Sequence, residues 1–163
     1  MSLFTWLEIA ATVFGLASVY LTTRQSIWCW PTGLVMVSLY VVIFFHAKLY
    51  SDTLLQVVYI FVQFYGWFHW KKGGDEPGHE LPVTRLSARE WVLWLAVSAA
   101  GAAALGAFMA YQTDASFPYA DAAIASLSLV AQWLMARKVL ENWHFWIAVD
   151  VLAIGVYLGK NLY

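Results

Sequence analysis

The sequence predicts an all-α integral membrane protein that forms a single transmembrane domain, and its composition and apolar runs support this prediction. Of the 163 residues, 62% are hydrophobic and only 12% are charged. Soluble domains typically contain about 25% charged residues. Several apolar runs approach the roughly 20 residues that a helix needs to cross a bilayer. The net charge of -1 gives no sign of nucleic-acid binding.

Six helices are expected, separated by polar or turn-forming residues. The first has no basic segment before it and no small-residue cleavage site after it, so we interpret it as a membrane span and not a signal peptide. The second begins near Pro31, a residue suited to a first helical turn. The fourth contains only Ser, Ala and Gly at 98–104, which favours close helix packing. The expected ranges are 4–23, 30–46, 54–70, 90–111, 118–136 and 142–160.

The connecting segments indicate how the chain sits in the membrane. Short polar turns are expected at 24–26 and 48–52, and residues 71–88, which contain Gly, Pro and charges, form the one clear linker. Since cytoplasmic loops carry the excess of Lys and Arg, we place this linker in the cytoplasm and the N-terminus outside. Seven of the nine basic residues fall on the linker side: Arg24, Lys71, Lys72, Arg85, Arg89, Arg137 and Lys138.

An internal repeat becomes visible when the chain is aligned with itself, without gaps, so that Arg24 falls on Arg137. In this repeat register Trp30 falls on Trp143, and Tyr50 on Tyr163. Both copies start on the same side of the membrane, which predicts parallel repeats over 4–70 and 117–163, joined by the helix at 90–111. This is a 3+1+3 arrangement whose second repeat is incomplete, so we expect the intact protein to have a seventh helix that is missing from this sequence.

The last helix carries polar and aromatic residues that suit a flat, cationic solute. Asn142, Trp146 and Asp150 recur every four residues and share a helix face, and Trp143 lies one turn before Trp146. Tryptophan faces attract cationic rings, Asp150 would balance the charge, and Asn142 would bind a hydroxyl or amide. The alternative places the tryptophans in the interfacial belt and pairs Asp150 with another helix.

The third helix presents a second polar stripe. Tyr59, Gln63 and Trp67 recur every four residues, and Gln56 lies one turn before Tyr59. A glutamine amide both donates and accepts hydrogen bonds, so it suits ribose hydroxyls or a carboxamide. The alternative is hydrogen bonding between helices, a common use of polar residues in membranes.

The two repeats are not equivalent at these positions. Trp30 and Gly33 correspond to Trp143 and Trp146, so the first copy lacks the second aromatic ring. We therefore expect one pocket, weighted toward the third and sixth helices. We interpret Trp30 as an anchor at the membrane interface, with a place in the lining of the site as the alternative.

Several kinds of chemistry find no support in the sequence. Cys29 is the only cysteine, which excludes an internal disulfide. No spacing of His, Asp, Glu or Cys resembles a metal site, a nucleophile with its base, or a phosphate-binding loop. We expect neither an enzyme nor a bound cofactor. Proton relays need several intramembrane carboxylates or histidines, and Asp150 stands almost alone, so passive transport is favoured over proton coupling.

Four stretches together resemble the PnuC family of bacterial nicotinamide riboside transporters and its thiamine-carrying relatives, often named PnuT. The resemblance covers both repeats, nearly the whole chain apart from the linker. The stretches are Trp-Cys-Trp-Pro-Thr-Gly at 28–33, Lys-Leu-Tyr-Ser-Asp at 48–52, Tyr-Gly-Trp-Phe-His-Trp at 65–70 and Arg-Lys-Val-Leu-Glu-Asn-Trp-His-Phe-Trp at 137–146.

The resemblance implies a bundle like that of a full-length SWEET transporter, in the bacterial inner membrane. It implies facilitated diffusion, with a cytoplasmic kinase that traps the product by phosphorylation, a site between the third and sixth helices, and a homotrimer. Nicotinamide riboside and thiamine are both flat and cationic, so the residues do not separate them. The alternative of another class is a non-transporting membrane subunit whose polar residues only hold helices together.

Overall fold

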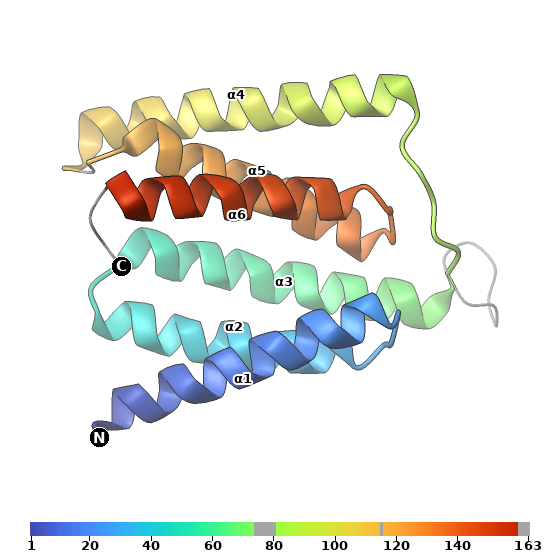
Figure 1. Cartoon of the computed structure of the whole chain (residues 1–163), viewed down its shortest axis with the longest axis horizontal. Helices are drawn as coiled ribbons and strands as arrows, with labels where there is room; N and C mark the ends of the chain where they lie inside the picture. The colour runs from blue at the N-terminus through green and yellow to red at the C-terminus, as the bar shows by residue number, and fades with distance from the viewer. Residues whose placement is uncertain (74–80, 115, 160–163) are drawn as a thin grey trace. The chain divides into compact units, whose positions relative to one another are not determined.

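The computed structural model describes residues 1–73, 81–114 and 116–159, in which the regular secondary structure is helical (Figure 1). The predicted all-α class is therefore confirmed. The predicted range 118–136 is reproduced by α5, and most other ends agree within two residues. The helices are α1 (Leu3–Thr23), α2 (Cys29–His46), α3 (Tyr50–Lys72), α4 (Ala88–Gln112), α5 (Pro118–Ala136) and α6 (Asn142–Gly159).

The start of α3 corrects the prediction. The helix begins at Tyr50 and not at 54, so the turn expected over 48–52 is confined to the residues before Tyr50. Lys48 adopts a positive φ of 60° there. The backbone N–H of Thr53 donates to the carbonyl of Leu49 at 2.9 Å, which closes the first helical turn. Asp52 lies in that turn, where the helix dipole favours a negative charge, so a residue that suits a loop also suits a helix start.

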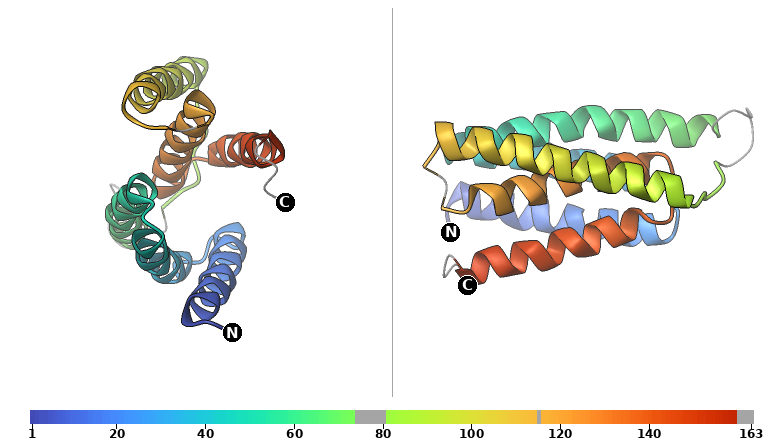
Figure 2. Two further views of the ribbon diagram at one scale, coloured as in Figure 1. Left: turned by 90° about the vertical axis from the view of Figure 1, so that its left-hand side faces the viewer. Right: turned by 90° about the horizontal axis from the view of Figure 1, so that it is seen from above.

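The chain divides into two compact units, residues 1–82 and residues 83–163. In the first unit α2 packs against both α1 and α3 and lies between them (Figure 2). Trp30 of α2 is fully buried against Gly66 of α3, where any Cβ would overlap its ring. Its ring also meets Trp70 edge to face at 5.3 Å. The expectation that Trp30 anchors the membrane interface is wrong, because Gly66 opens a space between the helices that its indole fills.

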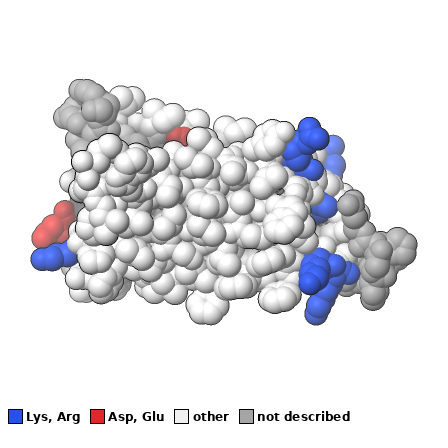
Figure 3. All heavy atoms as spheres, turned by 90° about the horizontal axis from the view of Figure 1, so that it is seen from below, with Lys and Arg blue, Asp and Glu red and all other residues white. Residues whose placement is uncertain are grey.

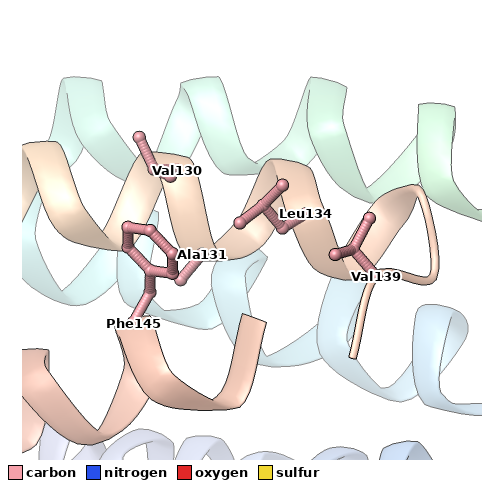
Figure 4. Close-up of a cluster of buried hydrophobic side chains, with 5 residues drawn as sticks. All are labelled: Val130, Ala131, Leu134, Val139 and Phe145. Carbon is pink, nitrogen blue, oxygen red and sulfur yellow. The ribbon is translucent and has the colours of Figure 1, made fainter. Parts of the chain in front are cut away.

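In the second unit α5 packs between α4 and α6 (Figure 2). The predicted small-residue patch of α4 allows close contact: a Cβ at Gly101 would overlap the side chain of Ser126. The Ser126 hydroxyl donates to the carbonyl of Ser98 at 2.9 Å. α5 also builds a buried apolar cluster with α6 and the turn between them (Figure 4). Its members are Val130, Ala131, Leu134, Val139 and Phe145.

The turns that follow α1 and α5 match one another in the repeat register. The backbone N–H of Arg24 donates to Tyr20 at 3.2 Å, and that of Arg137 donates to Trp133 at 3.1 Å. The next residues, Gln25 and Lys138, have positive φ values of 54° and 59°. The register found in the sequence therefore holds in the backbone of this turn. The 3+1+3 arrangement of the whole chain remains a prediction.

Four helices in the described part of the chain are long and apolar enough to cross a membrane: α1, α2, α4 and α5. The eight candidate residues lie on the other two, α3 and α6. Large apolar side chains such as Leu16, Phe61 and Val92 are exposed on the helix flanks. On the face drawn in Figure 3 most atoms are uncharged, and Lys and Arg gather near helix ends. Lipid is the solvent for such flanks, so this is a multi-pass membrane protein.

Candidate functional site

The Gln63 amide of α3 is the most buried of the four candidates on that helix. Its side chain is 5% exposed and lies against Gly33 of α2, where an added Cβ would come within 2.9 Å of both amide heavy atoms. The same Cβ would lie 3.1 Å from the hydroxyl of Ser18 on α1. The missing side chain of Gly33 therefore makes room for polar groups from both neighbouring helices.

Gln63 is not fully satisfied by the protein. Its Oε1 is buried and has no hydrogen-bond partner among the described residues. The indole Nε1 of Trp30, also buried, lacks a partner in the same part of the chain. Buried polar atoms are normally paired, so an unpaired acceptor and an unpaired donor in one helix trio indicate a place for an outside polar group. The sequence favoured the interface over site lining for Trp30, although its match to Trp143 was a usable signal.

Gln56, Tyr59 and Trp67 share the α3 stripe with Gln63 and are half-buried. Gly66 and Trp70, which lie on the buried side of α3, form its contact with Trp30. The stripe therefore follows the edge of the contact between α2 and α3. Side chains at such an edge are partly fixed by packing and partly open to a solute.

Asn142 begins α6, and the structure fixes the orientation of its amide. The side chain is 5% exposed, and its Nδ2 donates to the carbonyl of Val139 at 2.6 Å. The other amide atom, Oδ1, is buried and has no partner in the described residues. Asn142 therefore presents an acceptor, and the group it is placed to bind is a donor such as a hydroxyl or an amide N–H.

Trp143 and Trp146 are both half-buried on α6. Trp146, which follows Phe145 in the chain, packs against the apolar cluster that α5 and α6 share. Phe145 in turn stacks on Trp91 of α4, with ring centroids 5.7 Å apart. The cluster thus supports Trp146, whose side chain is only partly covered within its unit.

Asp150 is exposed on α6, one turn beyond Trp146. It takes part in no ion pair or hydrogen bond among residues 83–114 and 116–159 of its own unit. The alternative that Asp150 serves to join helices therefore has no support within this unit. Its carboxylate remains available to a cation.

Two buried polar residues of the second unit were not predicted as functional. Gln132 of α5 is buried, and its Nε2 lacks a partner in the described part of the chain. The signal was available, because an amide in an apolar helix is unusual. Glu141 is buried in the turn before α6, with its carboxylate hydrogen bonded to the segment that enters α4. No sequence signal points to that contact.

The eight predicted residues thus fall into two sets of four, one on each of two helices. The structure places Gln56, Tyr59, Gln63 and Trp67 in the first unit and Asn142, Trp143, Trp146 and Asp150 in the second. Among its described residues, each unit also holds one buried unpaired donor and one buried unpaired acceptor. Across the same residues, no group of three or more His, Cys, Asp or Glu side chains could hold a metal ion.

Comparison with known proteins gives matches along nearly the whole chain. The family model described as nicotinamide mononucleotide transporter matches residues 5–163. The nicotinamide riboside transporter PnuC of Escherichia coli is 28% identical over 98% of this chain and 77% of its own length. The PnuC of Neisseria mucosa is 31% identical over 94% of this chain and 60% of its own length.

A relative whose name gives another substrate also matches most of the chain. The riboflavin/roseoflavin transporter RibM of Streptomyces davaonensis is 29% identical over 91% of this chain and 70% of its own length. Among solved structures, the crystal structure of the vitamin B3 transporter PnuC matches with a TM-score of 0.76 and 29% identity. That match covers 98% of this chain and 71% of the solved chain. The similarity therefore extends over both units.

Proposed function

The chain belongs to the nicotinamide mononucleotide transporter family, and from this membership we propose that it carries nicotinamide riboside across a bacterial inner membrane. The relatives named as nicotinamide riboside transporters support this substrate. Transport is by facilitated diffusion, and a cytoplasmic kinase maintains the gradient by phosphorylating the product.

The observation that carries the proposal is the combination of groups on α6. Asn142 offers a buried amide acceptor, and two half-buried tryptophans follow it within one turn. Nicotinamide riboside combines a flat cationic ring with hydroxyl and amide donors. Trp146 and Trp143 would stack on the ring, Asp150 would balance its charge, and Asn142 would accept from a donor.

The α3 stripe, in the first unit, offers polar groups that also suit the polar part of the solute. Gln63 has a buried acceptor without a partner in the part of the chain that the structure describes, and Gln56 and Tyr59 lie on the same side of the helix. These groups suit ribose hydroxyls or the carboxamide, and Trp67 adds a second aromatic surface. The proposal therefore gives a role to residues of both α3 and α6.

A flavin is the second candidate substrate, because RibM, named as a riboflavin/roseoflavin transporter, is 29% identical over 91% of this chain. Thiamine is a further candidate on chemical grounds, since it is flat, cationic and hydroxyl-bearing. Charge separates these solutes: riboflavin is neutral, so a site that depends on Asp150 favours the other two.

A non-transporting membrane subunit is the alternative of another class. Residues that only hold helices together would bond to one another. Instead, Gln63 and Asn142 each keep a buried acceptor without a partner in the described residues. This arrangement favours a ligand site.

We place the linker 71–88 in the cytoplasm and the N-terminus outside, as the distribution of basic residues favours. The matching turns after α1 and α5 support parallel repeats over 4–70 and 117–163 in a 3+1+3 arrangement. A homotrimer is the proposed assembly. The mass of the protein in detergent, measured by light scattering, tests the proposed homotrimer separately from the transport function.

The test of function is calorimetric titration of the purified protein with nicotinamide riboside, thiamine and riboflavin in parallel. We expect binding of nicotinamide riboside, followed by saturable uptake when the protein is reconstituted in vesicles. If only riboflavin binds, the proposed substrate is wrong but the proposal that the protein is a transporter stands. Binding of nicotinamide riboside without uptake would contradict transport.

A further inference from the structure

The segment that enters α4 is joined to the turn between α5 and α6. The backbone N–H of Thr84 donates to the carbonyl of Lys138 at 3.1 Å, and the N–H of Leu140 donates to the carbonyl of Thr84 at 2.9 Å. These bonds form a parallel bridge between Thr84 and Val139. An extended segment outside the helices therefore holds the turn that leads into α6.

Glu141 adds a side-chain contact to this bridge. Its carboxylate is 4% exposed and accepts from the backbone N–H of Leu86 at 3.0 Å and from Nε of Arg85 at 3.4 Å. Burial raises the pKa of Glu141, but the hydrogen bonds from backbone N–H groups and Arg85 outweigh it and the pKa is lowered. The buried group is therefore a carboxylate anion. Because Arg85 is largely exposed, the Leu86 N–H is the main fixed partner of the Glu141 carboxylate.

These contacts involve the residues that immediately precede Asn142 in the chain. Val139, whose carbonyl accepts from the Asn142 amide at 2.6 Å, is the residue bridged to Thr84. Glu141 directly precedes Asn142. The acceptor that orients the amide and the backbone that carries it are therefore both held by the segment before α4.

The first repeat has no equivalent among its described residues. In the repeat register Trp28 takes the place of Glu141 and is 65% exposed, and Cys29 takes the place of Asn142. The two turns share their backbone hydrogen bonds. The buried carboxylate belongs to the copy that carries Asn142 and the paired tryptophans, so turn formation alone does not explain it.

We propose that Glu141 is a positioning residue for the solute site: it holds the start of α6 against the segment before α4 and so fixes the direction of the Asn142 amide oxygen. This inference rests on the proposed function. Glu141 touches no solute. It acts through Asn142, and its loss lets the amide turn away from the donor that it binds.

A double-mutant cycle tests this role, with nicotinamide riboside affinity measured by calorimetry on the full chain. The variants are Glu141→Ala, Asn142→Ala and the double variant. We expect each single change to weaken binding, Asn142→Ala by roughly tenfold. The double variant is expected to bind no more weakly than Asn142→Ala alone, because Glu141 acts only through that amide. Glu141→Gln keeps an acceptor for the Leu86 N–H and is expected to restore most of the affinity.

Glu90→Ala is the matched control. Its carboxylate accepts from the N–H of Ser87 at 2.8 Å in the same segment but is exposed and lies at the start of α4. We expect it to leave solute affinity unchanged. If Glu141→Ala does not fold, Glu141→Met takes its place in the cycle, because it keeps a similar side-chain volume and removes the carboxylate that accepts from the Leu86 N–H.

Each outcome is decisive for one claim. Additive losses in the cycle, or full affinity in folded Glu141→Ala, would overturn the positioning role and leave the proposed function standing. If the unaltered protein binds none of the three solutes, the proposed function fails and the positioning role fails with it.

Discussion

Trp30 of α2 lies across Gly66 of α3 so closely that a Cβ at Gly66 would overlap the indole ring. The ring is fully buried, and its outer part meets Trp70 edge to face. This contact fixes the distance between the two helices. It also positions the helix turn that carries Gln63, three residues before Gly66.

Gly66→Ala is therefore expected to destabilise the first unit. Overpacking of a closed contact costs about 1–3 kcal/mol, because the ring or the helix must move. Thermal unfolding in detergent measures the loss. Gly155→Ala on α6 is the control: nothing lies within 4 Å of a Cβ there, and alanine favours the helix, so stability is expected to hold or rise. Equal effects at the two glycines would contradict the packing argument.

Gln63→Leu is expected to separate stability from function. The substitution removes a buried oxygen that has no partner among the described residues, so unfolding stability should stay level or increase by about 1 kcal/mol. Solute affinity should fall by roughly tenfold, because a hydrogen bond to the solute is lost. Calorimetry and a melting curve on the same sample give both values. A large loss of stability would show that the amide serves the fold.

Trp146→Ala is expected to weaken nicotinamide riboside binding by about twofold to thirtyfold, the range of one cation–π contact. It should also lower stability, because the ring packs against the apolar cluster of α5 and α6. Trp146→Phe keeps an aromatic face and should lose less of both. If affinity is unchanged in folded Trp146→Ala, Trp146 does not line the site.

Asp150→Asn tests whether charge contributes to recognition. Because the carboxylate has no partner among the described residues of its unit, its removal should hardly change stability. We expect binding of nicotinamide riboside to weaken more than binding of a neutral analogue of the same shape, in parallel titrations. Equal losses for the two solutes would argue against an ion pair with the ring.

Acid is expected to loosen the contact between the α4 entry and the α5–α6 turn. Because the pKa of Glu141 is below its ordinary value of 4.5 in the folded protein, its contribution to stability is complete above that value. It is lost as the pH falls through the folded pKa. Melting temperatures between pH 7 and pH 3 should fall more steeply for the unaltered protein than for Glu141→Gln. Parallel curves would mean that the carboxylate contributes nothing.

The sequence by itself determined the helical class, the six helices and the register of the repeat. These features rest on local signals: apolar runs, charges at helix ends, and a Leu-Thr-Thr-Arg turn at 21–24 that matches Leu-Met-Ala-Arg at 134–137. The polar stripe of α3 was also readable, because its period is that of a helix. Even so, the start of α3 was missed, since Tyr-Ser-Asp suits both a turn and a first helical turn.

Only the tertiary structure decided which of these residues are buried and which polar atoms lack partners in the described part of the chain. Trp30 became a buried residue because Gly66, on another helix, leaves space for it. Gln132 and Asn142 gained significance from packing that covers them without satisfying them. The contact between Glu141 and Leu86 joins residues 55 positions apart. Such a pairing leaves no periodic pattern and no local bias of composition in the sequence, so it can be seen only once the helices have packed.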